Sequence, residues 1–390
     1  MGERVAIVGI GQTQHRRRRP DVSLGEMVNE AVRAALEDAG LTLKDMDAVL
    51  CSDMDFFEGD YLSNEMLADS VGSYLKPGLK VNTGGTTGGT AAIAGWYHVA
   101  SGLFDTVLTV AYQKLDEPIA STACMITCYD PLYDRDFGTG AIGVLAQMAL
   151  RYMATSGCSE EHGAMIRVKS DKNARRNPNA HLRLNISVED VMNSRMVTYP
   201  LRLLHICPDS AGACALVLAS EKKANKITNK PVWIKDHITV HRGYSALASA
   251  VSAIPSEQSH TVAARKLFAR NGIANPRKEL QTFEIYDPTS WAELEWLEDF
   301  MVCEKGEAWK LLEKGVWDLE GEFPVNPSGG VVCTNPIGAT AMIRVAEAAL
   351  QIRGDAGEHQ ATREVKRAIA SSWGGSSWSI LFLLTKSLYD

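Results

Sequence analysis

The chain has 390 residues, of which 45% are hydrophobic and 22% are charged, and its net charge is −7. This composition is typical of a globular protein long enough for two domains, and the acidic balance argues against nucleic-acid binding. No apolar stretch approaches the roughly 20 residues that a membrane helix needs, and the N-terminus enters a strand without a secretory leader. We therefore expect a cytoplasmic protein with no membrane contact.

The eight cysteines are scattered along the chain. Cys124 and Cys128 are four residues apart, but no second pair of Cys or His completes a zinc set at a recognised spacing. We therefore expect reduced thiols and no metal site in this chain.

The first 112 residues alternate buried strands with helices. The strands are expected at 5–10, 47–51 and 106–112, and the helices at 23–40 and 90–100. The first helix has Ser23 at its start and Gly40 at its end, which are residue types that cap helix termini. This alternation predicts an α/β fold with a largely parallel sheet.

Residues 113–210 interrupt the alternation. One helix is expected over 139–155, and the rest reads as polar loops, among them the Asn-, Arg- and Pro-containing stretch 171–178. Long loops inside a compact domain usually cover a site. We therefore expect these covering loops to lie over the functional site.

The second half of the chain repeats the order of the first. Strands are expected at 231–240, 283–286, 368–371 and 378–384, and helices at 262–274, 291–301 and 337–352. In each half a glycine-rich turn precedes a buried helix, at 82–89 and at 326–330. This pattern predicts two pseudo-repeated halves, 1–220 and 221–390, with the covering loops inserted in the first.

Four segments taken together resemble the thiolase superfamily, over nearly the whole chain. They are Asn82 to Gly89, Ile285-Tyr286-Asp287, Asn326 to Thr340, and Ser372 to Ser377. The stretch 326–340, which reads NPSGGVVCTNPIGAT, is similar to the N-P-x-G-G…G-H-P-x-G-A-T signature of the family. The stretch 199–207 and the apolar run after it are most similar to sterol-carrier-type and archaeal thiolases.

The resemblance implies the five-layered α/β/α/β/α thiolase fold. It also implies a homodimer core that takes acyl-CoA and CoA as substrates and binds no cofactor covalently. Relatives of this type often work with a small zinc-ribbon/OB-fold partner chain. We therefore expect such a subunit here, and any zinc would belong to it.

The chain departs from the family at three positions that carry its chemistry. The nucleophilic Cys falls on Gly85, the histidine that activates it falls on Asn335, and the second Cys, the usual acid/base, falls on Ser372. Acyl transfer through an enzyme-bound acyl group needs a nucleophilic side chain. Glycine has none, so an acyl-enzyme at position 85 is excluded by chemistry.

The electrostatic part of the site is expected to remain. The resemblance implies that the backbone N–H groups of Gly85 and Gly374 form an oxyanion hole, with Asn335 donating a further hydrogen bond. Such donors stabilise an enolate. Tyr286 is the candidate acid/base, because the steroid side-chain aldolases, which are thiolase-like and lack the Cys, use a tyrosine in a similar Tyr-Asp segment. The alternative is a tyrosine that ends a strand with its ring in the core.

Two further residues are catalytic candidates. Cys333 stands two residues before Asn335 and is a candidate substitute thiol, although a small buried core residue is the alternative. Ser372 keeps a hydroxyl at the acid/base position. Asp287 either orients Tyr286 or caps the following helix.

Four residues are expected to bind the substrate or CoA. Thr86 lies in the glycine-rich turn, and His205 lies in the 199–207 segment, where a buried histidine without such a role is the alternative. Arg175 and Arg176 suit the phosphates of CoA. The alternative is an ordinary pair of solvated surface charges.

These features leave three functions open. The first is a C–C-cleaving acyltransferase that acts with CoA on a bulky, aromatic 3-oxoacyl-CoA, as in the conversion of benzoylsuccinyl-CoA to benzoyl-CoA and succinyl-CoA; the overall similarity to the large subunit of benzoylsuccinyl-CoA thiolases favours it. The second is a retro-aldolase that acts on a β-hydroxyacyl-CoA such as a steroid side chain. The third is a catalytically silent subunit that binds CoA or a partner.

Overall fold

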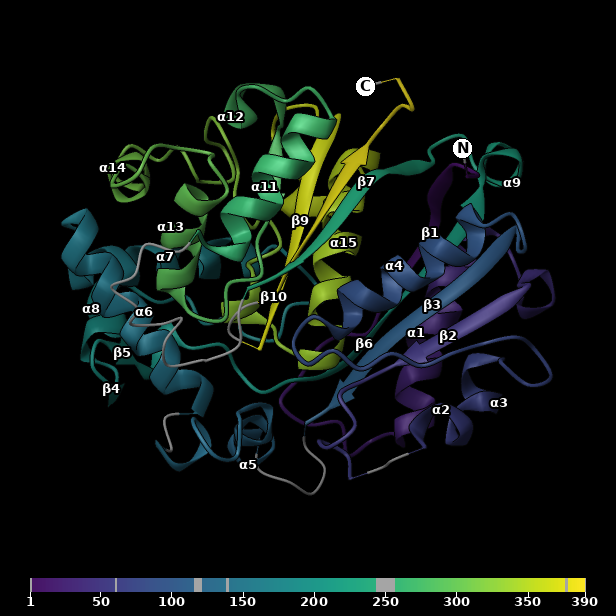
Figure 1. The fold of residues 1–390 in the computed structure, drawn as a ribbon, viewed down its shortest axis with the longest axis horizontal. Helices are drawn as coiled ribbons and strands as arrows, with labels where there is room; N and C mark the ends of the chain where they lie inside the picture. The colour runs from purple at the N-terminus through teal and green to yellow at the C-terminus, as the bar shows by residue number, and fades with distance from the viewer. Residues whose placement is uncertain are drawn as a thin grey trace.

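The computed structural model describes residues 2–59, 62–115, 121–137, 140–242, 257–375 and 378–389. In these ranges the main sheet has eight strands in the order β2-β3-β6-β1-β7-β10-β9-β8 (Figure 1). Their bounds are β1 Val5–Gln12, β2 Ala48–Ser52, β3 Thr106–Lys114, β6 Ala211–Ser220, β7 Val232–His241, β8 Thr282–Glu284, β9 Arg367–Gly374 and β10 Trp378–Thr385. A separate pair is formed by β4 (Met196–Thr198) and β5 (Leu201–Arg202).

The helices fall into three groups. In the first half they are α1 Leu24–Ala39, α2 Ser63–Met66, α3 Ala68–Val71 and α4 Thr87–Ala100. The covering region contains α5 Ser121–Met125, α6 Gly140–Ser156, α7 Glu160–Ala174 and α8 Val188–Asn193. The second half contains α9 Glu221–Ile227, α11 Ser259–Arg270, α12 Pro276–Glu279, α13 Ser290–Asp299, α14 Ala308–Glu313 and α15 Ile337–Arg353.

The helices and the sheet form five layers, as the resemblance implies. Helix α1 packs on one face of β1, β3 and β6 through one apolar cluster. The opposite face of these strands packs on α4 and α15, and the same cluster includes residues of β9 and β10. The far side of β9 and β10 is covered by α11 and α13. The buried helices α4 and α15 therefore lie between the two halves of the sheet (Figure 1).

The expectation of a largely parallel sheet is wrong. Only the outer pairs, β2 with β3 and β8 with β9, are parallel, and the neighbours between them are antiparallel. Strands β9 and β10 are joined by a short connection, which permits only antiparallel pairing. Strand β6 returns from the covering region and runs antiparallel between β3 and β1. Alternation of strands and helices along the chain does not specify these neighbours.

The cap residues of α1 are confirmed. The hydroxyl of Ser23 accepts a hydrogen bond from the backbone N–H of Glu26, and the Glu26 carboxylate accepts one from the N–H of Ser23. Gly40 ends the helix with a φ of 64°, a left-handed conformation that favours glycine. These caps fix the length of the helix that covers the N-terminal strands.

The covering region is more helical than its polar sequence indicates. The stretch 160–174, part of which reads as a polar loop, forms α7. One side of α7 is buried against α13. Gly163 lies in this contact, where an added Cβ would be 2.4 Å from the ring of Trp291, so no larger residue fits there. Buried polar partners inside the protein, rather than an apolar stripe, therefore hold α7 in place.

Candidate active site

The glycine-rich turn before α4 forms one wall of the site. Gly84 has a φ of 64° in this turn, and the Thr86 hydroxyl donates to the carbonyl oxygen of Thr83 at 2.7 Å. An added Cβ on Gly85 would lie 2.6 Å from the carbonyl oxygen of Trp373. The turn therefore leaves no room for a side chain at Gly85.

The Tyr286 hydroxyl stands beside this turn. Its oxygen would lie 3.3 Å from an added Cβ on Gly85. The residue is 3% exposed, and no hydrogen bond to its hydroxyl is present within the described ranges. Burial is the main cause that raises the pKa of Tyr286, the nearby Cys207 thiol raises it further, and Arg344 opposes both. The phenol is therefore neutral.

The backbone on either side of Tyr286 is held at three points. The Tyr286 N–H donates to the Ser371 hydroxyl at 2.9 Å, and the Ile285 N–H donates to the side-chain oxygen of Asn326 at 2.6 Å. The Asp287 carboxylate accepts a hydrogen bond from the N–H of Val331 at 2.7 Å. Asp287 thus ties the tyrosine segment to the glycine-rich turn at 326–330, whereas it does not contact the hydroxyl.

Two close contacts bring the backbone amides of the site together. An added Cβ on Gly374 would lie 3.0 Å from the backbone nitrogen of Gly85 and 2.9 Å from that of Thr86. At Gly88 it would lie 3.0 Å from the carbonyl oxygen of Gly338, so the first turns of α4 and α15 also touch. Both helices direct their positive ends toward this region, which favours a developing negative charge.

Asn335 and Cys207 form a second wall. The Asn335 side-chain oxygen accepts a hydrogen bond from the Thr340 hydroxyl at 2.8 Å, and its amide nitrogen donates to the Cys207 sulfur at 3.2 Å. The Cys207 N–H donates to the carbonyl oxygen of Pro288 at 3.0 Å, so the thiol lies next to the Tyr286 segment. Burial raises the pKa of Cys207 to about 12.

Cys207 was not among the residues that the sequence singled out. It ends the 199–207 segment that carries the family resemblance. Its place in that segment is the sequence feature that could have marked it as a candidate site residue. The residue is partly exposed, which distinguishes it from the fully buried cysteines of the core.

Ser372 and Cys333 lie near the same elements but face other partners. Within the described ranges the Ser372 oxygen is buried without a hydrogen-bond partner, and it would lie 2.3 Å from an added Cβ on Gly89. The Cys333 sulfur is fully buried, accepts a hydrogen bond from Arg167 at 3.3 Å, and has a pKa raised by burial to about 12. No hydrogen bond joins either side chain to Tyr286 in the described part of the chain.

The four expected binding residues do not gather at one point. Thr86 is buried and bonded within its turn. His205 is fully buried against Trp291, and burial lowers its pKa to about 4, so it is a neutral histidine. Arg175 and Arg176 are exposed and pair with Asp171 and Glu320. The CoA-binding roles of these residues stay predictions.

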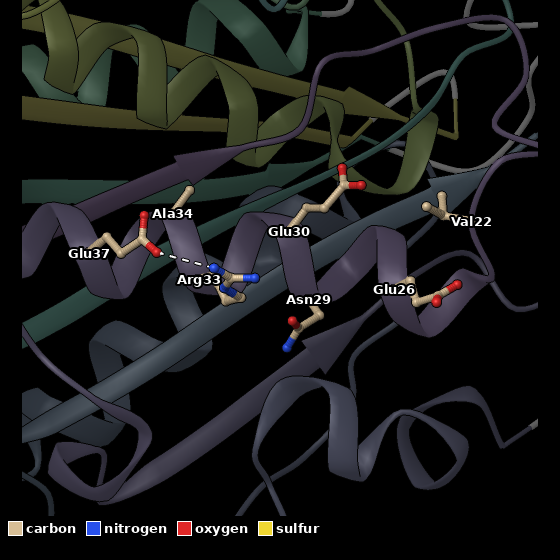
Figure 2. Close-up of a pocket in the computed structure, with 7 residues that line it drawn as sticks. All are labelled: Val22, Glu26, Asn29, Glu30, Arg33, Ala34 and Glu37. Carbon is tan, nitrogen blue, oxygen red and sulfur yellow. Dashed lines mark ion pairs between the residues drawn. The ribbon is translucent and has the colours of Figure 1, made fainter.

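Two surface hollows lie outside this group. One, of about 410 Å³, runs along the outer face of α1, where Arg33 and Glu37 form an ion pair of 3.6 Å (Figure 2). It is separated from α4 by the sheet. Another, of about 450 Å³, lies between α6 and the β4 segment. Neither is lined by Tyr286, Gly85 or Asn335.

Two further kinds of feature are absent from the described ranges, namely a cluster of metal-ligand side chains and a membrane-spanning helix. No three His, Cys, Asp or Glu side chains are grouped to hold a metal ion. No helix there is long and apolar enough to cross a membrane.

Comparison with known proteins gives consistent matches. Residues 245–385 match the family model described as thiolase C-terminal domain-like. The chain is 34% identical to an acetyl-CoA acetyltransferase of Methanothermobacter thermautotrophicus, over 91% of this chain and 92% of that protein. It is 29% identical to the benzoylsuccinyl-CoA thiolase subunit BbsB of Thauera aromatica, over 77% of each. The solved Ltp2-ChsH2(DUF35) aldolase superposes with a TM-score of 0.83 at 25% identity, over 99% of this chain and 98% of that one.

The layered fold and these matches define a thiolase-like acyl-CoA enzyme. The chain belongs to the thiolase superfamily. It combines the thiolase fold with a site in which Gly85 offers no side chain.

Proposed function

We propose that the protein cleaves a C–C bond of a bulky β-hydroxyacyl-CoA by retro-aldol chemistry. The observation that carries this proposal is the Tyr286 hydroxyl, whose oxygen is 3.3 Å from the point where a side chain on Gly85 would begin. The site thus presents a phenol to the substrate where a thiolase presents a thiolate. The structural similarity to the Ltp2-ChsH2(DUF35) aldolase supports the same reaction class.

The remaining groups suit the enolate that such a cleavage produces. When the bond between the α- and β-carbons breaks, its electron pair passes to the thioester oxygen. At this oxygen, hydrogen bonds would come from the backbone amides of Gly85 and Gly374. Positive potential would come from the first turns of α4 and α15. One such donor is commonly worth about 3–4 kcal/mol of barrier.

Tyr286 would carry the proton of the β-hydroxyl. Its oxygen receives this proton as the β-carbon becomes a carbonyl, and its own O–H proton leaves in the same step toward the enolate, so the phenol stays neutral. The products are one shortened thioester and one ketone or aldehyde, and no acyl group passes to the protein.

The test compares β-hydroxyacyl-CoA substrates that carry steroid or aromatic groups, with and without free CoA, and separates the products by mass. We expect cleavage without CoA that yields one thioester and one carbonyl compound. Cleavage that requires CoA and yields two thioesters would contradict the proposal. Absence of cleavage for every substrate would favour a silent subunit.

Thiolysis is the second candidate, and the similarity to BbsB favours it. The substrate would be an aromatic 3-oxoacyl-CoA such as benzoylsuccinyl-CoA, with CoA attacking the ketone directly because Gly85 offers no nucleophile. The same incubation with benzoylsuccinyl-CoA and CoA tests it, since benzoyl-CoA and succinyl-CoA would be the products.

Restoring a cysteine should not restore thiolase chemistry. We expect Gly85→Cys to form no acyl-enzyme, because its Cβ would lie 2.6 Å from the Trp373 carbonyl oxygen and the activating histidine is absent at Asn335. Intact-protein mass after mixing with a 3-oxoacyl-CoA measures this. An increase by the mass of the acyl group would refute the expectation.

A partner subunit is also part of the proposal. The names of two similar proteins describe a subunit and a two-component aldolase, which supports a small zinc-ribbon/OB-fold partner here. The exposed apolar side chains of Phe56, Met66, Tyr74 and Leu75 support a further contact with a second copy of the chain. Co-purification with a co-encoded small protein and the mass of the complex in solution test both. The cytoplasmic location and the boundary at 220/221 stay predictions.

A further inference from the structure

We propose that Cys207 is a catalytic residue of this site and that its thiol exchanges a proton with the α-carbon of the acyl-CoA. This inference deepens the proposed function and rests on it, because the α-carbon is the atom that becomes the enolate. It assigns the carbon acid/base to a residue outside the three positions that the family resemblance marks.

The first argument is the place of the thiol. The backbone N–H of Cys207 donates to the carbonyl oxygen of Pro288 at 3.0 Å, and the preceding Ile206 forms a β-bridge with Thr289. These contacts hold Cys207 against the segment that follows Tyr286.

The second argument is the hydrogen bond from Asn335. Its side-chain oxygen is engaged by the Thr340 hydroxyl, so its amide N–H₂ is directed at the Cys207 sulfur, 3.2 Å away. The Asn335 backbone is fixed by the hydroxyl of Ser210, which accepts its N–H at 3.0 Å. An N–H donor to sulfur stabilises the thiolate and opposes part of the effect of burial on the pKa.

The third argument is the orientation of the other candidates. Ser372, at the family's acid/base position, is buried against Gly89 of α4. Cys333 is buried against Arg167. Of these three residues, Cys207 is the one that is partly exposed.

The proton balance is simple. In the exchange direction, the α-C–H bond breaks, its proton forms the S–H bond on the thiolate of Cys207, and its electron pair becomes the enolate. In cleavage, the enolate takes the S–H proton and leaves the thiolate. Tyr286 then gives its own O–H proton to this thiolate while its oxygen takes the proton of the β-hydroxyl, so the phenol stays neutral and the S–H bond of the starting state is restored.

The test is deuterium uptake at the α-carbon of acetyl-CoA and propionyl-CoA in D₂O, followed by mass. We expect uptake with the unaltered protein, and uptake at least tenfold slower with Cys207→Ala and with Cys207→Ser. The serine variant keeps an acceptor for the Asn335 amide, so it is expected to fold. Cys128→Ser, which changes an exposed cysteine, should exchange at the original rate.

Either of two results would overturn the inference. One is no uptake by the unaltered protein with either thioester. The other is uptake at the original rate by a Cys207 variant with an unchanged thermal unfolding midpoint. The cleavage assay is separate: uptake that depends on Cys207 without cleavage of any β-hydroxyacyl-CoA would refute the retro-aldol proposal and leave the role of the thiol intact.

Discussion

Tyr286→Phe is expected to lower kcat for β-hydroxyacyl-CoA cleavage by roughly 10³-fold, within the range found when a general acid or base is removed. The change deletes only the oxygen that stands 3.3 Å from the Cβ position of Gly85. The ring is packed in the core of the C-terminal half, and the hydroxyl has no hydrogen-bond partner among the described residues, so the fold should be retained. Initial rates under substrate saturation measure the effect.

Tyr112→Phe is the matched control. Tyr112 is a fully buried tyrosine of β3 whose side chain packs on the α1 face of the sheet, away from the glycine-rich turn. We expect its kcat to stay within about twofold of the original, as for changes without a catalytic role. A Tyr286→Phe protein as active as the Tyr112→Phe protein would remove the phenol from the mechanism.

Arg344→Met is expected to lower the free energy of unfolding by about 3–5 kcal/mol, the usual cost of removing one partner of a buried ion pair. Arg344 is 1% exposed and donates to Glu284 at 2.5 Å and to the Ser328 hydroxyl at 2.6 Å. Without it, the fully buried Glu284 carboxylate has lost its cation. Because Glu284 ends β8, two residues before Tyr286, activity should fall as well.

Urea denaturation of the purified variants measures this loss. The control is Arg265→Met, which breaks the exposed pair with Glu257 and should cost at most about 1 kcal/mol. An equal decrease in the free energy of unfolding for Arg344→Met and Arg265→Met would mean that the buried ion pair does not hold β8 and α15 together.

Much of the fold could be predicted from the sequence. The helices from Leu24, Thr87 and Ile337 follow from capping residues, glycine-rich turns and apolar periodicity, which are local signals. The strand order is not local, since it depends on which neighbour each buried strand pairs with. Helix α7 was missed because its buried face carries charged residues such as Lys169, which pairs with Glu293 at 2.6 Å; a buried ion pair leaves no apolar stripe.

The candidate site could be predicted only in part. The family signature marks Gly85, Tyr286 and Gly374, and the structure brings these three together because backbone geometry follows the motif. Cys207 was not predicted as a site residue, because a cysteine in an apolar segment resembles a core residue. Its hydrogen bond with Asn335 is visible only in the structure. The interpretation of His205 as a buried histidine agrees with its burial, and Arg175 and Arg176 already have acidic partners.

The measurement that tests the central claim most directly is intact-protein mass during turnover. The protein, with any partner subunit, is mixed in excess over a cleavable β-hydroxyacyl-CoA without CoA and quenched at intervals. We predict that shortened thioester and carbonyl product accumulate while the mass of the chain stays unchanged, since Gly85 cannot hold an acyl group. A transient increase equal to the acyl group, appearing before the products, would contradict the account.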